Sequence, residues 1–199
     1  MLKMRAMIVP GPGGRFRMEE RDLPEPGRHE VRIRIHACGV CHSDSVTVEG
    51  LLPGLSYPRI PGHEVIGVID ALGPNVEGWD VGARVGVGWF GGSCGYCAHC
   101  RRGAAFACEN IHSATGVTRD GGYATHMLAL ASALAHVPEA LDPVESAPLP
   151  PRETRFGAGL VFGHCGRLGR HASVQSAQRH RLDERDFSTR RNPGRLMTG

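Results

Sequence analysis

The sequence predicts a mainly β fold, in the form of a compact β-barrel-like domain with minor helices. Glycine and proline are frequent, with 28 and 14 residues in a chain of 199, and this favours turn-rich β structure over long helices. Short runs of alternating or β-branched apolar residues are separated by these turn residues, as in small barrels. A helical period is absent over most of the first 149 residues.

The first predicted strands form a hairpin. Residues 4–9 (MRAMIV) and 15–20 (RFRMEE) flank the turn sequence PGPGG. A proline-punctuated connection over residues 23–30 leads to residues 31–38 (VRIRIHAC), in which apolar and polar side chains alternate. This period of two predicts a half-buried strand.

A short helix and three more strands are expected further along the chain. Ser43 and Asp44 can cap a short helix that ends before Gly50. β-Branched or glycine-containing runs then predict strands over residues 65–72, 81–87 and 121–128. A cysteine-rich loop separates the last two of these strands.

That loop contains the most specific motif of the chain, Cys94-x2-Cys97-x2-Cys100-x7-Cys108. Four thiolates at this spacing can surround one tetrahedral metal ion and leave no coordination position open. Zn²⁺ prefers such a soft donor set, so the motif predicts a structural zinc lobe.

The four cysteines allow two other interpretations. Buried or disulfide-bonded cysteines are one, but short Cys-x2-Cys steps in a chain without secretory features favour a metal. An iron–sulfur cluster is the other, because bacterial ferredoxins use a related run that ends Cys-x3-Cys-Pro. Here the last gap is seven residues, and Glu109 follows Cys108.

Charge is divided unevenly along the chain. Residues 1–150 carry 13 Lys and Arg against 16 Asp and Glu, whereas residues 151–199 carry 10 Arg, no Lys and 4 acids. The net charge of +3 therefore comes from the C-terminal segment. A mildly acidic body argues against specific nucleic-acid binding, which needs a basic face.

The chain has no pattern of a membrane or secreted protein. No apolar run approaches the roughly 20 residues of a membrane-spanning helix. The N-terminal apolar stretch is too short for a secretory signal and continues directly into the first strand. We therefore expect a cytoplasmic protein whose cysteines are reduced or bound to metal, and no membrane partner.

A second candidate metal site is formed by Cys41 and His63. Cys and His from separate loops are typical of an open catalytic zinc site, where three protein ligands leave one position for water or substrate. The pair by itself is weak evidence, and a buried cysteine with a surface histidine explains it more simply.

The motifs together resemble a known family. In order along the chain stand ACGVCHSD, PGHEVIGVI, WDVGARV, the four-cysteine motif and DGGYA. This arrangement resembles the zinc-dependent alcohol dehydrogenases of the medium-chain dehydrogenase/reductase family, over roughly residues 3–149.

The resemblance implies a fold and site roles. Residues 1–149 would be a GroES-like catalytic domain, followed in the family by a Rossmann domain that binds NAD(P). Its catalytic zinc would be held by Cys41 and His63, with the acidic neighbour Glu64 beside or transiently on the metal. The carboxylate of Asp44 would orient the histidine ligand. Ser43 would begin a proton relay from the substrate, and His42 would lie near the cofactor phosphates. His42 would also stand at the far end of the relay.

The implied function is oxidation of an alcohol to an aldehyde or ketone with NAD(P). Zinc would lower the pKa of the alcohol, and the nicotinamide would accept the hydride. The implied partners are a small-molecule alcohol or aldehyde and further copies of the chain, because family members form homo-oligomers. Such oligomers often assemble through the cofactor domain.

The sequence departs from the family pattern after Leu149. The family's third catalytic zinc ligand is usually a cysteine at this point, but Pro150 and Pro151 follow. Residues 163–169 keep only a partial glycine-rich turn, G-x-x-G-x-L-G, without the strand and helix that a dinucleotide site needs. Residues 150–199 are therefore interpreted as a degenerate or disordered remnant of the NAD(P)-binding domain, truncated or read in a shifted frame.

Three functional hypotheses follow. The first is a zinc-dependent alcohol dehydrogenase, impaired here by an incomplete catalytic zinc site and weakened NAD(P) binding. The second is a non-catalytic β domain that folds around its structural zinc. The third is a zinc-ribbon nucleic-acid module with an arginine-rich tail, which the catalytic-type loop Cys41–Asp44 disfavours.

Overall fold

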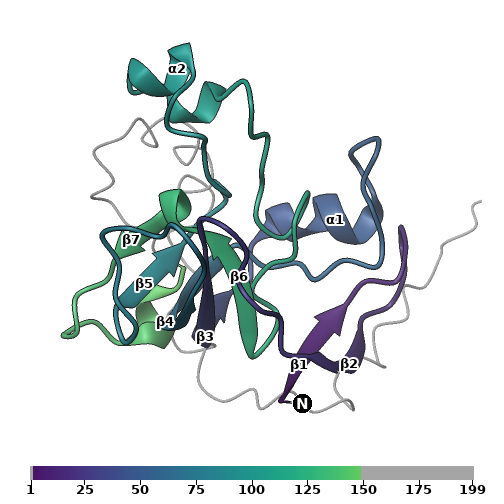
Figure 1. Cartoon of the computed structure of the whole chain (residues 1–199). Helices are drawn as coiled ribbons and strands as arrows, with labels where there is room; N and C mark the ends of the chain where they lie inside the picture. Colours follow the sequence, from purple (N-terminus) through teal and green to yellow (C-terminus); the bar gives the residue numbers. More distant parts are fainter. Residues whose placement is uncertain (1, 149–199) are drawn as a thin grey trace, which may run out of the picture. The chain divides into compact units, whose positions relative to one another are not determined.

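The computed structural model describes residues 2–148, which form mostly β structure with a few short helices (Figure 1). The strands are β1 (Lys3–Ile8), β2 (Arg17–Asp22), β3 (Glu30–Gly39), β4 (Glu64–Leu72), β5 (Arg84–Val87), β6 (His126–Leu130) and β7 (Leu134–His136). The α-helices are α1 (Ser45–Glu49), α2 (Ala98–Arg101) and α3 (Pro143–Ser146). Three 3₁₀ turns complete the elements, at His42–Asp44, Ala105–Ala107 and Ala131–Ala133.

Five strands form one antiparallel sheet in the order β6-β3-β4-β5-β7. The long strand β3 lies between β4 and β6, so residues 30–39 contribute to two ladders. β1 and β2 form a separate antiparallel hairpin. Backbone hydrogen bonds from Met7 to Tyr123 and from Thr125 to Arg5 attach this hairpin to the segment that precedes β6.

The main core lies on one face of the five-stranded sheet. Val31 and Ile33, alternate residues of β3, are fully buried, whereas Arg34, which follows Ile33, is exposed. Their apolar partners come from each of the other four strands, with Val65, Ile69, Val85, Val87, Met127, Ala129 and Leu134 in one cluster. A second, smaller cluster under the hairpin contains Met4, Ala6, Ile8 and Ile60. Burial of these side chains is the main stabilising contribution of the sheet.

Strands β3 and β4 approach each other closely at Gly67. A Cβ atom at this position would meet the backbone oxygen of Arg34 and would lie 2.6 Å from Cγ2 of Ile33. The β3–β4 register shifts between Ile35 and Ala37, next to this contact. The absence of a side chain at Gly67 is therefore what allows the two strands to pair here.

The cysteine-rich loop projects away from the sheet and carries α2 at its tip (Figure 1). Its two ends return to the body by a backbone hydrogen bond from Gly91 to Ser113 and by the bridge between Phe90 and Ala114. The side chain of Ser132 accepts a hydrogen bond from the backbone of Ser93. The loop is thus anchored at its base, while its tip is organised within itself.

The mainly β fold predicted from the sequence is confirmed. β3 and β4 match the predicted ranges closely, and the expected short helix is α1. The prediction of a strand over residues 121–128 is wrong in its first half, because Gly121, Gly122 and Tyr123 instead donate backbone hydrogen bonds to residues 60–62. Pattern reading also missed β7, α2 and α3, which are three or four residues long.

The interpretation of residues 150–199 lies outside the described residues. Among residues 2–148, none of the helices has the length and apolar content needed to cross a membrane.

We expect Gly67→Ala to lower the free energy of unfolding by about 1–3 kcal/mol, as overpacking of a close contact does. Gly88→Ala is the matched control, because a Cβ at Gly88 meets nothing within 4 Å. Urea denaturation of both variants checks this. Equal stabilities of the two variants would show that β3 and β4 can separate at little cost.

Candidate metal centres

Two groups of metal-binding side chains form within residues 2–148. One consists of Cys41, His63 and Glu64, and the other of Cys94, Cys97, Cys100 and Cys108. In each group the ligand atoms lie within 4.8 Å of one another. The first group lies where β3 ends and β4 begins, and the second lies in the projecting loop.

The four cysteines of the loop are arranged for one tetrahedral ion. The Sγ atoms of Cys94 and Cys100 are 3.9 Å apart, and all four thiols are free. Four Zn–S bonds of about 2.3 Å place neighbouring sulfurs about 3.8 Å apart in a tetrahedron. A disulfide needs about 2.05 Å between sulfurs. The geometry therefore fits the predicted zinc lobe and contradicts the disulfide alternative.

Backbone N–H groups surround these sulfurs. The amide of Cys97 donates to Sγ of Cys94, and the amide of Cys100 donates to Sγ of Cys97, each over 3.4 Å. The amides of Cys94 and Ile111 both donate to Sγ of Cys108. Such donors stabilise thiolates, which are the form that binds zinc.

The thiols of the lobe do not behave alike. Burial tends to raise the pKa of Cys94, but hydrogen bonds from the backbone of Tyr96 and Cys97 and from the side chain of Asn110 outweigh it and lower the pKa to about 6. For Cys100, burial and the neighbouring thiol of Cys97 raise the pKa to about 11. Four adjacent thiolates repel one another, so full ionisation of the set requires a cation.

The first metal group is assembled by the pairing of β3 with β4. Gly39 ends β3 and lies opposite Glu64, the first residue of β4. Cys41 follows β3 by two residues, and His63 directly precedes β4. The antiparallel ladder therefore brings together two motifs that are 22 residues apart in the sequence.

A buried carboxylate, Asp44, lies behind this group. Its Oδ1 accepts a hydrogen bond from the backbone N–H of Gly62 (3.2 Å) and lies 3.2 Å from Nδ1 of His63, off the line of an aligned hydrogen bond. Its Oδ2 accepts from the backbone N–H of Cys41 (3.0 Å) and from the hydroxyl of Tyr123 (2.6 Å). Asp44 is 7% exposed and His63 is 2% exposed. We call these four donor groups around Asp44 the carboxylate cage.

The cage changes the acidity of both partners. Burial tends to raise the pKa of Asp44, but contacts with His63, Tyr123 and Cys41 outweigh it and lower the pKa. Burial likewise tends to lower the pKa of His63, but the Asp44 carboxylate raises it above its usual value. Asp44 is therefore ionised at neutral pH. With Oδ1 of Asp44 beside Nδ1, Nε2 is the atom of His63 that is available to a metal.

Cys41 and Glu64 have different surroundings. Burial acts to raise the pKa of Cys41, and hydrogen bonds from the side chain and backbone of Ser43 and from His63 lower it overall. Burial raises the pKa of Glu64, which is half-buried against Gly39. A Cβ atom at Gly39 would collide with the carboxylate of Glu64.

The other predicted site residues occupy the 3₁₀ turn after Cys41. The hydroxyl of Ser43 lies 3.5 Å from Sγ of Cys41, and Ser43 is half-buried. His42 is exposed. The structure therefore brings Cys41, Ser43, Asp44, His63 and Glu64 together and places His42 on the solvent side of the same turn.

Two aromatic residues that the sequence did not predict as part of the metal site contact it. Tyr123 belongs to the cage, although its motif DGGYA was noted only as part of a family pattern. Trp89, which the sequence predicts as a packing residue or, less strongly, as part of a substrate cleft, stands edge-on to His63 with ring centroids 4.9 Å apart. These roles depend on contacts between segments that are far apart in the sequence, so the spacing of residues within one motif does not indicate them.

Cys38, which the sequence analysis did not count as a ligand, is outside both groups. Its side chain is half-buried, and a Cβ atom at Gly122 would lie 2.8 Å from its sulfur. Burial raises its pKa to about 12, so this thiol is neutral at physiological pH.

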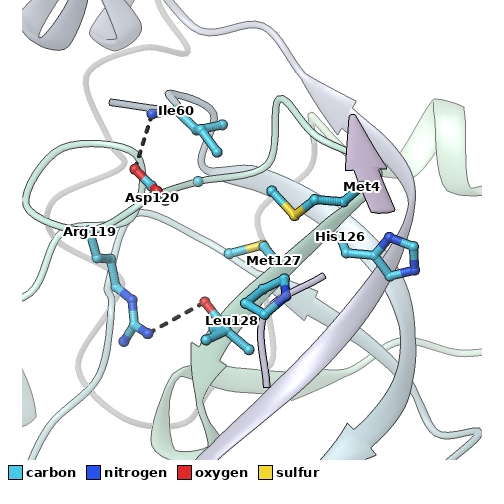
Figure 2. A pocket seen from close by; sticks show the side chains of 9 residues that line it. Met4, Ile60, Arg119, Asp120, His126, Met127 and Leu128 are labelled. Atoms are coloured by element: carbon cyan, nitrogen blue, oxygen red, sulfur yellow. Dashed lines mark hydrogen bonds between the residues drawn. The ribbon is translucent and has the colours of Figure 1, made fainter. Parts of the chain in front are cut away.

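One pocket of the described residues lies apart from both metal groups. Figure 2 shows Met4 and Met127 along it, with Arg119, Asp120 and His126 at its edges. Its polar groups already have partners, because Asp120 accepts from the backbone of Ile60 and Arg119 donates to Leu128 and Glu30. None of the candidate ligands lines it.

We expect Cys108→Ser to lower the zinc content of the purified protein by about one equivalent per chain, because a structural site uses all four ligands. The variant should also unfold at lower urea concentration, since metal binding contributes to folding. Cys38→Ser is the control and should keep its zinc. Metal analysis and urea denaturation check this, and an unchanged zinc content of Cys108→Ser would contradict the assignment of the lobe.

Comparison with known proteins gives a family for this architecture. Residues 27–139 match the family model described as the alcohol dehydrogenase GroES-like domain. Alcohol dehydrogenase patD of Aspergillus clavatus is 41% identical over 132 residues, which are 66% of this chain and 34% of that protein.

Two solved structures are also similar. A cobalt- and zinc-bound thermostable alcohol dehydrogenase from Pyrobaculum aerophilum superposes with a TM-score of 0.67 at 32% identity, covering 75% of this chain and 45% of the other. The short chain alcohol dehydrogenase rspB of E. coli CFT073, complexed with NADH, superposes with a TM-score of 0.63 at 34% identity, covering 73% and 41%.

The chain spans about half or less of the length of these proteins. The matched region contains both metal groups and the carboxylate cage. This chain belongs to the zinc-type alcohol dehydrogenases of the medium-chain dehydrogenase/reductase family and contains their GroES-like domain.

Proposed function

We propose that the chain carries the metal- and alcohol-binding part of an NAD(P)-linked alcohol dehydrogenase, with residues 1–149 as its domain. The observation that supports this most directly is the cluster of Cys41, His63 and Glu64, whose ligand atoms lie within 4.8 Å of one another in front of a buried aspartate. A purely structural site of this family would need no such open, mixed set of donors.

The donors fit zinc. A thiol, an imidazole and a carboxylate are all common zinc ligands, and three protein ligands leave a position for substrate. When bound, zinc would supply Lewis-acid polarisation of an alcohol hydroxyl. The Asp44 contact to Nδ1 of His63 is the orientation that metal-bound histidines generally require.

Proton movement is assigned to Ser43 and His42. The Ser43 hydroxyl lies 3.5 Å from the sulfur of Cys41, and can therefore both accept and donate a proton beside the candidate ligands. His42 is the adjacent residue and faces solvent. We assign Ser43 to the substrate proton and His42 to its exchange with water, and also to the cofactor phosphates, as the resemblance implies.

Glu64 is assigned to the metal as an exchangeable ligand. Its carboxyl group is partly desolvated, and this burial raises its pKa. A nearby cation would offset that cost of charging the carboxylate. The bare backbone of Gly39 leaves the room that its side chain occupies. The Glu64 carboxylate can therefore lie beside the metal, close to the ligand atoms of Cys41 and His63.

A second candidate function is a non-catalytic zinc-binding domain. The observation that favours it is the sequence after Leu149, where Pro150 and Pro151 replace the cysteine expected as third catalytic ligand. The four-cysteine lobe, in contrast, has its full set of donors.

NAD(P) is the hydride acceptor under the first proposal, and small-molecule alcohols or aldehydes are the substrates.

We expect one tightly held zinc per chain and a second metal that dialysis removes. The physical reason is that the lobe offers four thiolates, whereas the first group offers one sulfur, one nitrogen and one carboxylate. Metal analysis before and after dialysis checks this, with Cys41→Ser and Cys108→Ser to assign each ion. Two zincs that both survive dialysis would contradict the incomplete-site prediction.

Cobalt at the second site offers a direct test of alcohol binding. With zinc retained in the lobe, we expect a short primary alcohol to change the visible spectrum of Co²⁺ bound at Cys41, His63 and Glu64. Cys41→Ser should abolish this signal, and Cys38→Ser should keep it. An unchanged spectrum at saturating alcohol would contradict the proposed function.

Hydride transfer separates the two candidate functions. The zinc-loaded chain is assayed for reduction of NAD⁺ and NADP⁺ by short alcohols, alongside titration with NADH. Any turnover should fall roughly 100-fold or more in Ser43→Ala, since a positioned proton-transfer group contributes about 10²–10⁴. Turnover that depends on Ser43 would contradict the non-catalytic candidate, and alcohol binding without turnover would favour it.

A further inference from the structure

Tyr123 makes a contact that neither metal group explains. Its hydroxyl donates a 2.6 Å hydrogen bond to Oδ2 of Asp44, a residue 79 positions earlier in the sequence. Of the contacts that the described residues 2–148 make with Asp44, this is the shortest and the only one from a side-chain hydroxyl. A tyrosine–carboxylate bond in a low-dielectric site is strong, because the acceptor is charged.

The backbone holds Tyr123 rigidly in place. Its N–H donates to the carbonyl of Pro61 (3.0 Å), and its carbonyl accepts from Met7 of β1 (2.7 Å). The preceding Gly122 donates to Gly62 (2.9 Å). Tyr123 is therefore tied to the same loop that presents His63.

The ring of Tyr123 also covers this loop. Gly62 has a φ of +97°, which favours glycine, and a Cβ there would lie 2.6 Å from Cδ1 of Tyr123. The ring also lies near that of Phe16, with centroids 6.2 Å apart. The hydroxyl thus contacts Asp44, and the ring packs against Gly62, the residue before His63.

The hydroxyl decides how freely Asp44 can turn. The terminal torsion of an aspartate is broad, so hydrogen bonds and not an intrinsic rotamer fix the plane of its carboxylate. Oδ1 must stay directed at Nδ1 of His63 for the imidazole to present Nε2. Without the Tyr123 hydroxyl, Oδ2 would keep only the amide of Cys41 at 3.0 Å.

We propose that Tyr123 is a positioning residue for the metal ligand His63, acting through Asp44. It is not one of the candidate metal ligands, and its hydroxyl completes the carboxylate cage that orients the imidazole. The proposal rests on the proposed metal site at Cys41, His63 and Glu64.

Tyr123→Phe tests this, because it removes the hydroxyl and keeps the ring over Gly62. With zinc retained in the lobe, Co²⁺ alone is titrated into the second site and followed by its visible spectrum. We expect roughly a tenfold weaker affinity, the low end of the 10–100-fold loss seen when a partner of a metal-bound histidine is removed. The shape of the cobalt spectrum should also change.

Tyr57→Phe is the matched control. Tyr57 is half-buried, and its hydroxyl also makes a 2.6 Å hydrogen bond, but to the backbone carbonyl of Thr47 and outside the cage. It should bind Co²⁺ like the unmodified chain. Equal loss of affinity in both variants, or no loss in Tyr123→Phe, would overturn the role of Tyr123.

A double-mutant cycle tests the route through Asp44. In an Asp44→Asn background, Tyr123→Phe should cause little further loss of Co²⁺ affinity, since the two changes break the same chain of contacts. Full additivity would overturn the proposal. No second-site Co²⁺ binding by the unmodified chain would instead contradict the proposed metal site, and the role of Tyr123 with it.

A measurement on the unmodified chain avoids any folding defect of the variants. The hydroxyl proton of Tyr123 should exchange slowly with water, and its NMR resonance should shift when zinc enters the second site. A resonance that does not respond to zinc would overturn the proposal.

Discussion

The buried carboxylate of Asp44 is the constraint on which the site depends. An ionised carboxylate that is 7% exposed is costly unless its charge is met by donors, and here four donor groups from three separate segments meet it. Those segments are the turn after β3, the loop before β4 and the segment before β6. Satisfying one charge therefore holds together the two pieces of chain that present the candidate ligands and the third piece that carries Tyr123.

Close backbone packing supports this arrangement. The loop at Gly62 lies against Tyr123, Gly116 and Gly121, so closely that a side chain on these glycines would collide with the neighbouring chain. The same segments share backbone hydrogen bonds, with Gly121 bonded to Ile60 and Gly122 to Gly62. His63 is consequently placed by a rigid loop, which a metal site requires of its ligands.

The two metal groups are built on different principles. The four-cysteine lobe is local in sequence, because a single 15-residue segment supplies all its ligands and many of the amides that surround them. The group at Cys41, His63 and Glu64 exists only when β3 pairs with β4 in the correct register. Loss of sheet stability should therefore affect the group at Cys41, His63 and Glu64 before it affects the four-cysteine lobe.

The sequence by itself determined the mainly β class, strands β3 and β4, and the four-cysteine cluster, because alternation of apolar residues and Cys-x2-Cys spacing are local properties. Its motifs also pointed to the family that comparison then confirmed. The three-residue strand β7 and the four-residue helices gave no detectable pattern, since so few residues show no period. Only the tertiary structure decided that Asp44 contacts His63, that Tyr123 completes its cage, and that Trp89 lies edge-on to the imidazole. These contacts join residues 19 to 79 positions apart, and the direction of the side chains after folding, which no local pattern encodes, brings them together.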